Sequence, residues 1–495
     1  MPQGRDETGS ADPAFSKLGL IVALLPIFVM VVVGAEQRIY LLAPVALIFG
    51  MAVYRWPVSS LAALVLMMGS PIYIRVFGRD AGVVTTFLIV EMYGISLLRK
   101  SLRRETSLVG PAILILLVYG LAIPQLTSFD LVLGSTRLFI GLMSAFMLLH
   151  LILSYCVSHK SLNPVVGCLL IMILFQALVA VGQAYFPNAE VPGAQLLAAR
   201  GSTVGPALAS GVYRATGTIG DYELLAEWFA AALPIALSMM LGAGGFPPGI
   251  VLPYVLLIIA GLLATVTRGG IVAAGLGLAV FLALLTRQRQ GRALGIVVAT
   301  ILGIGLPLAM TQLLFPGLVQ GMMDRLNNAP VSLDLSRGLF PAFAMAINRS
   351  RWLSLPGFIT EAHLLGYGFL PLRLLNYAGA GSLHSLWLTL WFQGGIIGVG
   401  SWAWLATSLG RAARSSLHSS RFPRASAVPI GFVASVVAML ASEMKVEFLR
   451  SEPTMQFFFL IVGLGVAFFR FSSMAAAQSA GPSTGWEHEQ VSLAP

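Results

Sequence analysis

The sequence predicts an all-α polytopic membrane protein with about fourteen transmembrane helices and a large loop on one face. The first observation is composition: 57% of the residues are hydrophobic, 10% are charged, and the mean hydropathy is +0.87. A soluble chain would carry about a quarter charged residues. Second, apolar segments approaching the roughly 20 residues that cross a bilayer recur along the chain. Third, Lys and Arg cluster between these segments, which is typical of cytoplasmic loops.

The chain is expected to begin with a disordered cytoplasmic stretch, residues 1-17, before a first apolar run at Leu18–Gly34. Val33-Gly34-Ala35 could serve as a signal-peptidase site, so cleavage there is an alternative. The length of the run and the three acidic residues in the leader favour a first transmembrane helix instead.

The apolar segments place helices 1 to 11 within 18-314 and helices 12 to 14 within 385-471, with outer loops at 187-222 and 315-384. A disordered cytoplasmic tail, 472-495, is expected after them because its residues are small and polar. Beyond the first run, the candidate spans are Ile39–Val53, Ser59–Ile74, Ala81–Leu98, Leu108–Ile123, Leu131–Tyr155, Val165–Tyr185, Glu223–Leu241, Val251–Val266, Ile271–Thr286, Leu294–Leu314, Ser385–Leu409, Ala425–Ser442 and Met455–Phe471.

Three clusters of basic residues fall on the same side of these spans. The positive-inside rule places that side in the cytoplasm, together with both termini. The loops 187-222 and 315-384 then lie on the opposite, outer face. The clusters are Arg99, Lys100, Arg103 and Arg104; Arg287, Arg289 and Arg292; and Arg411, Arg414, Arg421 and Arg424.

In a soluble protein, the net charge of +10 would suggest a nucleic-acid partner. In a membrane chain it is expected from basic loops held at anionic lipids and from arginines at an anion site, so no nucleic acid is predicted. The two cysteines, Cys156 and Cys168, form no metal-binding spacing and no disulfide framework. No D-x-D, H-E-x-x-H or P-loop motif occurs, so neither a metal nor a cofactor is predicted.

The first outer loop contains Arg214 and then the run Gly217–Ala226, which is predicted to open a helix. The free N–H groups and the dipole of such a helix start favour a nearby anion. The alternative is an ordinary helix start that is capped by Asp221 or Thr218.

Two further features suggest charge-based chemistry on the outer face. Glu223 and Glu227 lie one helical turn apart, where they could do acid–base work or, alternatively, pair with an arginine or face the interior. Arg268 lies in Thr265-Val266-Thr267-Arg268-Gly269-Gly270, between two apolar segments. Its planar guanidinium suits phosphate and the glycines allow close approach, although such an arginine can also snorkel or pair internally.

Several stretches between about Thr216 and Gly400 resemble, in order and spacing, motifs of the O-antigen ligase and O-antigen polymerase superfamily. Helices outside that range are matched only by hydrophobicity. The stretches are Gly217-Thr218-Ile219-Gly220 followed by Leu224-Leu225-Ala226, Thr265-Val266-Thr267-Arg268-Gly269, Leu365-Gly366-Tyr367-Gly368-Phe369, His384-Ser385-Leu386-Trp387 and Gln393-Gly394-Gly395-Ile396-Ile397-Gly398. They are similar, in turn, to the family's G-T-x-G, T-x-S/T-R-G, G-x-G-F, H-N-S-Y-L and G-x-x-G patterns.

The resemblance implies a GT-C-like membrane glycosyltransferase in a bacterial inner membrane. Members of this family move a glycan from an undecaprenyl-pyrophosphate carrier to an acceptor sugar on the periplasmic side, without a nucleotide or a metal. The implied partners are the undecaprenyl-pyrophosphate-linked glycan, a glycan or lipid A–core acceptor, membrane lipids and other polysaccharide-assembly proteins. These residues do not separate a ligase from an O-antigen or exopolysaccharide polymerase.

Carried over to this sequence, the resemblance makes His384 the general base or hydrogen-bond partner for the acceptor hydroxyl. It makes Arg268 the residue that holds the pyrophosphate and stabilises the departing charge. Arg337 is the expected second arginine, with Arg325 as the alternative. Ser385 replaces the usual Asn of the family, which suggests altered substrate contacts. The residues considered as further substrate contacts are Arg214, Asp221, Glu223 and Ser385.

Two other classes of protein remain open. A transporter or flippase for polysaccharide or lipid-linked oligosaccharide would also have about fourteen helices. It would use charged residues near the bilayer midplane, and no internal symmetry supports it. A structural membrane subunit would leave the ordered outer-face motifs unexplained. The charged candidates for a transporter are Glu91, Arg137, Glu443 and Glu447.

Overall fold

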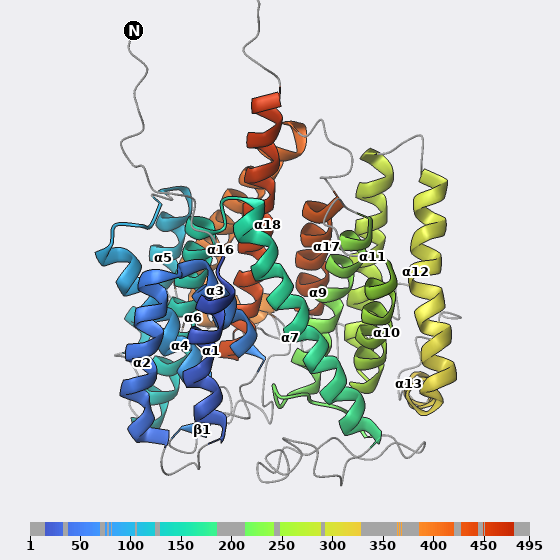
Figure 1. Ribbon diagram of the computed structural model, residues 1–495, viewed down its shortest axis with the longest axis horizontal. Helices are drawn as coiled ribbons and strands as arrows, with labels where there is room; N and C mark the ends of the chain where they lie inside the picture. Colours follow the sequence, from blue (N-terminus) through green and yellow to red (C-terminus); the bar gives the residue numbers. More distant parts are fainter. Residues whose placement is uncertain are drawn as a thin grey trace, which may run out of the picture.

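The computed structural model shows a bundle of α-helices with one short β-hairpin (Figure 1). It describes residues 15–32, 38–69, 75–76, 79–80, 82–103, 106–123, 129–185, 213–241, 248–288, 293–327, 364, 366, 368, 386–419, 427–443, 449 and 451–479. In the hairpin, β1 (Arg75–Val76) pairs with β2 (Arg79–Asp80) in antiparallel register. Apart from that hairpin, the helical class predicted from the sequence is confirmed for the described residues.

Each predicted apolar segment overlaps a helix. In the first part of the chain these are α1 (Lys17–Val32), α2 (Arg38–Arg55), α3 (Pro57–Met68), α4 (Gly82–Leu98), α5 (Thr106–Ala122), α6 (Phe129–Tyr155) and α7 (His159–Tyr185). The later ones are α9 (Tyr222–Leu241), α10 (Pro248–Ala264), α11 (Arg268–Gln288), α12 (Ala293–Leu314), α16 (Leu386–Ser419), α17 (Ala427–Ser442) and α18 (Glu452–Ser479). One more helix, α13 (Pro316–Asn327), lies inside the range predicted as the second outer loop.

Five of the described helices are long and apolar enough to cross a membrane by themselves. There are six such spans if α12 and α13, which meet at a bend of 100°, count as one. Shorter apolar helices such as Val84–Leu98 and Leu108–Leu121 stand beside them and do not reach the length of a full crossing, roughly 20 residues. These helices identify a multi-pass helical membrane protein.

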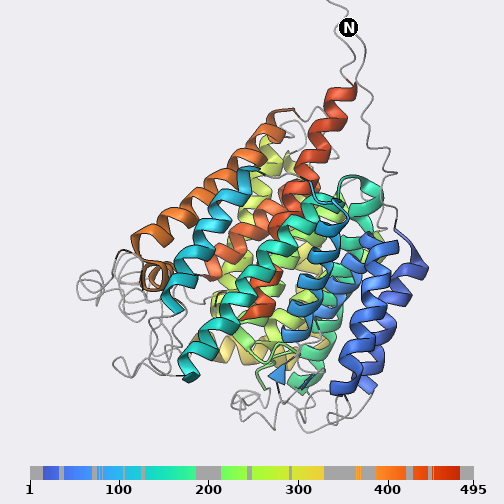
Figure 2. The ribbon, with the colours of Figure 1, turned by 90° about the vertical axis from the view of Figure 1, so that its left-hand side faces the viewer.

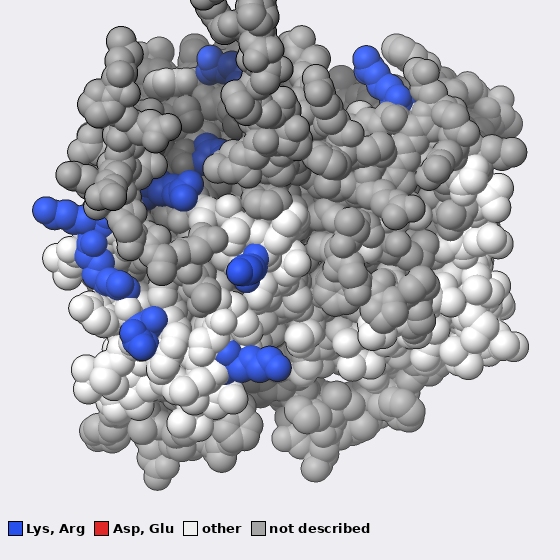
Figure 3. Space-filling model, turned by 45° about the horizontal axis from the view of Figure 1, so that its top comes forward, with Lys and Arg blue, Asp and Glu red and all other residues white. Residues whose placement is uncertain are grey.

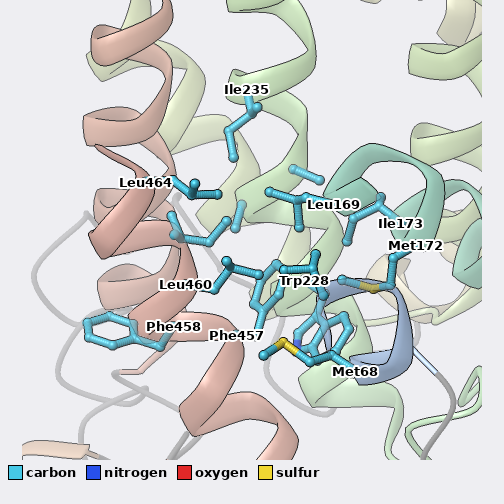
Figure 4. Packing of buried hydrophobic residues seen from close by; sticks show 14 of the residues in the cluster. Met68, Leu169, Met172, Ile173, Trp228, Ile235, Phe457, Phe458, Leu460 and Leu464 are labelled. Carbon is cyan, nitrogen blue, oxygen red and sulfur yellow. The ribbon is translucent and has the colours of Figure 1, made fainter. Parts of the chain in front are cut away.

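The centre of the bundle is built from α9 and α18, which have few exposed residues. Trp228 of α9 stacks on Phe457 of α18, with the ring centroids 4.2 Å apart (Figure 4). Leu169 and Ile173 of α7 lie beside this pair in the same buried cluster. Because burial among lipids gains little from the hydrophobic effect, such close contacts stabilise a membrane bundle mainly by packing.

Close contacts at small residues show in which direction the helices around α9 run. A Cβ added at Gly270 of α11 would lie 2.6 Å from the Cβ of Ala226, and one at Gly277 would lie 3.5 Å from Pro234. The later contact on α11 lies against the later residue on α9, so α9 and α11 run parallel. Ser435 of α17 donates to the carbonyl of Ala231, whereas the preceding turn of α17 contacts the following turn of α9. α17 is therefore antiparallel to both, and its C-terminus meets the N-termini of α9 and α11.

The opposite end of the bundle is rich in basic residues. Ser101, after α4, is hydrogen-bonded to Tyr155 at the end of α6 (2.8 Å), so Arg99, Lys100 and Arg103 lie there. α11 ends and α12 begins at the same end, at the top of Figure 1. Figure 2 shows α16 (orange) at the edge of the bundle that lies away from α1 and α2 (blue). Figure 3 shows Lys and Arg, and no described Asp or Glu, on this face.

Candidate functional site

A buried polar loop, residues 213–221, leads into α9 and is held by two glutamines of α7. Gln183 Oε1 accepts from the backbone N–H groups of Thr216 (3.1 Å) and Gly217 (2.8 Å). Gln176 Oε1 accepts from the N–H of Thr218 (3.1 Å), and its Nε2 donates to the Thr218 hydroxyl (2.6 Å). The side chains of α7 thus satisfy three backbone N–H groups of the loop, as buried polar groups require.

Gly217 is required by the geometry of this loop. Its φ is +58°, a region that an L side chain rarely adopts. A Cβ there would also lie 2.6 Å from Gln176 Oε1. The G-T-x-G stretch therefore depends on Gln176 and Gln183, which sequence reasoning missed. The available signal was two buried amides, seven positions apart, in an otherwise apolar helix.

Asp221 caps the start of α9. Its Oδ1 accepts from the backbone N–H groups of Glu223 (2.8 Å) and Leu224 (3.2 Å). Of the two predicted caps, Asp221 is therefore right and Thr218 is wrong, because the Thr218 hydroxyl donates to the carbonyl of Gly69 instead (2.6 Å). The cap occupies one carboxylate oxygen and fixes where the helix begins.

The connection from α10 to α11 is a tight turn that holds a strained residue. Only Thr265, Val266 and Thr267 separate the two helices. Val266 is fully buried and has φ +49°, a left-handed conformation that is rare for a β-branched side chain. Such backbone strain costs about 1–3 kcal/mol and clusters at functional sites. Arg268 is the first residue of α11, directly after this turn.

The side chain of Arg214, in the loop, contacts both α9 and the turn between α10 and α11. Its guanidinium lies 3.4 Å over the ring of Tyr222, a cation–π contact. Its Nε donates to the carbonyl of Thr265 (3.3 Å), and its Nη2 donates to the Thr267 hydroxyl (3.4 Å). Only 6% of the residue is exposed. The structure thus places a fixed, buried positive charge beside the turn that carries Arg268.

Acidic side chains line the same helix start. Glu223 is half-buried and Glu227, one turn later, is fully buried. Arg268, also half-buried, begins the parallel helix, which touches α9 where Gly270 meets Ala226. The predicted residues Arg214, Asp221, Glu223 and Arg268 therefore lie at one end of the bundle, where two helix N-termini present their positive dipole ends.

The start of α16 reaches the same end. The N–H of Leu386 donates to the carbonyl of Glu443 (2.8 Å), and Glu443 follows the last residue of α17 and is fully buried. Among the predicted site residues, His384, Ser385 and Arg337 lie outside the described residues, as does the side chain of Arg325. The predicted helix 339–348 also lies outside them.

Two of the glycine-containing stretches lie against each other. The N–H of Gly368 donates to the carbonyl of Gln393 (2.8 Å), and a Cβ at Gly366 would lie 2.5 Å from that same carbonyl oxygen. Gly395, next along α16, has φ +59° and breaks the helix in two. The first of the two parts of α16, which begins at Leu386, therefore ends at this kink.

Two further findings concern metal ligands near the site and the similarity of the chain to known proteins. In the part of the chain that the structure describes, no three His, Cys, Asp or Glu side chains are placed to share a metal ion. Comparisons of the sequence with models of known protein families and with curated proteins found no match. The fold and the site thus define a multi-pass helical membrane protein with a buried, arginine-containing polar site at one end of its bundle.

Proposed function

We propose that this protein is a periplasmic-face glycosyltransferase of the O-antigen ligase or polymerase type, with a GT-C-like fold of about fourteen spans. The single observation that carries the proposal is that three chain segments lie at the same end of the bundle. These are the loop with Arg214, the strained turn before Arg268, and the start of α16 directly after Ser385. They are far apart in the sequence and each belongs to a motif region of the resemblance.

The distribution of charge supports the orientation. The site lies at the end of the bundle opposite Arg99, Lys100 and Arg103. By the positive-inside rule, the basic end faces the cytoplasm of a bacterial inner membrane and the site faces the periplasm. The start of α1 and the end of α18 lie at this same basic end (Figure 1), which agrees with the even number of spans that the proposal expects.

Covalent geometry limits where His384 can act. Successive Cα atoms are 3.8 Å apart, so the Cα of His384 lies within about 8 Å of that of Leu386. Leu386 is anchored to Glu443, at the end of α17 that meets α9 and α11. The proposal therefore puts His384 at the end of the bundle that carries Arg268, and it requires the two side chains to share one site there.

The proposed reaction is a direct displacement. The acceptor oxygen bonds to the anomeric carbon of the donor glycan, while the bond from that carbon to the phosphate oxygen breaks. Undecaprenyl pyrophosphate leaves, and the hydroxyl proton passes to His384, because a histidine side chain of ordinary pKa, about 6.5, can accept a proton near pH 7. Arg268, with Arg337 or Arg325, stabilises the charge on the leaving pyrophosphate, and the configuration at the anomeric carbon inverts.

Arg268 and Arg287 provide a matched test because they bracket the same helix, α11. Purified protein is given undecaprenyl-pyrophosphate glycan, with and without a lipid A–core acceptor, in the presence of a chelator. Arg268→Ala is expected to lower turnover by about 10²–10³-fold, as for loss of a charge-stabilising donor. Arg287→Ala is expected to leave turnover unchanged.

The same assay separates the related activities. A product that requires lipid A–core identifies a ligase, whereas longer carrier-linked glycans without it identify a polymerase. Full activity of a well-folded Arg268→Ala variant contradicts the site assignment.

One observation favours the flippase alternative. Arg137 of α6 forms an ion pair with the buried Glu452 at the start of α18. Charged residues within membrane spans often mark transport pathways. In proteoliposomes, a flippase would move a fluorescent lipid-linked oligosaccharide between leaflets without any change in its glycan length. The glycosyltransferase proposal expects a changed product instead.

A further inference from the structure

A second candidate site lies at the basic end of the molecule. A cleft of about 280 Å³ opens between α4, α5 and α6. Its walls are apolar, with Leu108, Ala112 and Leu116 on α5 facing Phe146 and Met147 on α6. The volume lies just below the range of small-molecule pockets, about 300–1,000 Å³, which suits a single narrow chain.

The cleft opens towards the outer surface of the bundle. Val109 and Ile113 border it and are 39% and 51% exposed, although both are apolar. They belong to an apolar helix, so the surface that they form faces lipid. A ligand would therefore enter from the bilayer and contact the apolar walls with a hydrocarbon chain.

Among the described residues that line the cleft, the polar side chains are Tyr93 and His150, and both are held at one end of it. His150 Nε2 lies 2.8 Å from the carbonyl oxygen of Arg103. A carbonyl can only accept, so Nε2 carries the proton and donates it. In the neutral ring Nδ1 then accepts from the hydroxyl of Tyr93, at 3.0 Å. These contacts fix the end of the cleft directly beneath the backbone of Arg103.

Basic residues lie in the chain connection that passes over that end of the cleft. Arg99, Lys100 and Arg103 are exposed residues in the connection from α4 to α5. The N–H of Arg103 donates to the Ser154 hydroxyl at the end of α6 (3.2 Å), which holds this connection over the cleft. On this face, Figure 3 shows no acidic side chain among the described residues that would neutralise it.

We propose that this cleft binds one acyl chain of an anionic phospholipid, with the phosphate of the headgroup beside Arg103. Apolar walls that open to the bilayer select a hydrocarbon chain, and the exposed basic residues at the polar end select a negative headgroup. The inference does not depend on the proposed glycosyltransferase activity, because the cleft lies at the opposite end of the bundle from Arg268.

Native mass spectrometry of the purified full-length protein tests the assignment. The probes are phosphatidylglycerol, phosphatidylcholine with the same acyl chains, and undecaprenyl phosphate. The wild-type protein is expected to prefer phosphatidylglycerol to phosphatidylcholine. Arg103→Ala is expected to lower the affinity for phosphatidylglycerol roughly fivefold, the effect of one basic side chain near a membrane surface, and to leave phosphatidylcholine unchanged. Arg287→Ala, the same change away from the cleft, is expected to alter neither.

A second variant tests the walls. Ala112→Trp fills the cleft, and it is expected to lower the binding of both phospholipids while the thermal midpoint stays near that of the wild type. Equal affinity for the two phospholipids overturns the proposal, as does tighter binding of undecaprenyl phosphate that Ala112→Trp abolishes. Should Ala112→Trp fail to fold, the Arg103→Ala and Arg287→Ala pair decides alone: equal loss in both overturns the proposal.

Discussion

Gly217 shows how a single backbone conformation positions the candidate site. Its positive φ turns the chain so that Thr216, Gly217 and Thr218 present their N–H groups to the glutamines of α7. With these bonds made, Asp221 is in place to cap α9. A residue with no side chain therefore determines where a carboxylate and two arginines come to lie.

Gly217→Ala is expected to destabilise the protein by about 1–2 kcal/mol, the cost of a left-handed L residue, and further by displacing Gln176. Its thermal midpoint in detergent should fall, and turnover in the transfer assay should fall with it. Gly167→Ala, in α7, is the control because nothing lies within 4 Å of the added Cβ. Equal midpoints for the two variants would show that the loop tolerates a side chain.

Some residue roles follow from sequence and others need the fold. The helix cap at Asp221 was expected because an acidic residue before an apolar periodic run is a typical N-cap. The choice between Asp221 and Thr218 was not available, since Thr218 is taken up by a contact with Gly69, 149 positions away. The ion pair of Arg137 with Glu452 likewise joins residues 315 positions apart, although Arg137 was noted as an unusual charge within a span.

At the scale of elements, the close contact of α9, α11 and α17 carries the candidate site. α11 approaches α17 where a Cβ at Gly277 would lie 2.8 Å from that of Ala438. α17 is followed directly by Glu443, whose carbonyl accepts from the N–H of Leu386 at the start of α16. The spacing of α11 and α17 therefore affects how far Leu386 lies from Arg268.

Gly277→Leu is expected to push α17 away from α11, because overpacking of a tight interface costs typically 1–3 kcal/mol. Turnover and thermal midpoint should both fall. Gly275→Leu, two positions earlier on the exposed face, is the control because its Cβ would meet nothing within 4 Å. An active Gly277→Leu variant would show that this interface does not set the geometry of the site.

The helices themselves were largely predictable, whereas their details were not. Hydropathy identifies apolar segments because lipid tolerates few charges, and each predicted segment overlaps a helix. α13 was missed because its polar face lowers the hydropathy of the segment, so that it read as loop. The break in α16 was missed as well, because Gln393-Gly394-Gly395 is compatible with a straight apolar helix until Gly366 and Gly368 are seen packed against it.

The whole molecule has two ends of different character. One end holds the exposed basic residues of the helix connections, and the other holds the buried loop, the strained turn and the helix N-termini. Hydropathy and basic clusters predicted that division, whereas the contacts that assemble each end are long-range and could not be read from the sequence. The sidedness of the protein in its membrane is therefore the prediction that belongs to this scale.

Cysteine labelling tests that sidedness without removal of the native thiols. Burial raises the pKa of Cys156 to about 12, so it stays a protonated thiol near pH 8, and Cys168 is also buried. We expect neither to react with maleimide in the folded protein. An added Leu364→Cys should react with a membrane-impermeant maleimide in spheroplasts, whereas Lys160→Cys should react only after permeabilisation. The reverse pattern would contradict the proposed orientation.

α9 is the least apolar of the five long spans, yet protein encloses it almost completely. It also carries Glu227 into the interior. During biosynthesis α9 leaves the ribosome before α10, α11 and α17, the neighbours that later shield it. Its stable integration therefore depends on these later segments. Only after they have been translated can protein shield the carboxylate of Glu227 from lipid.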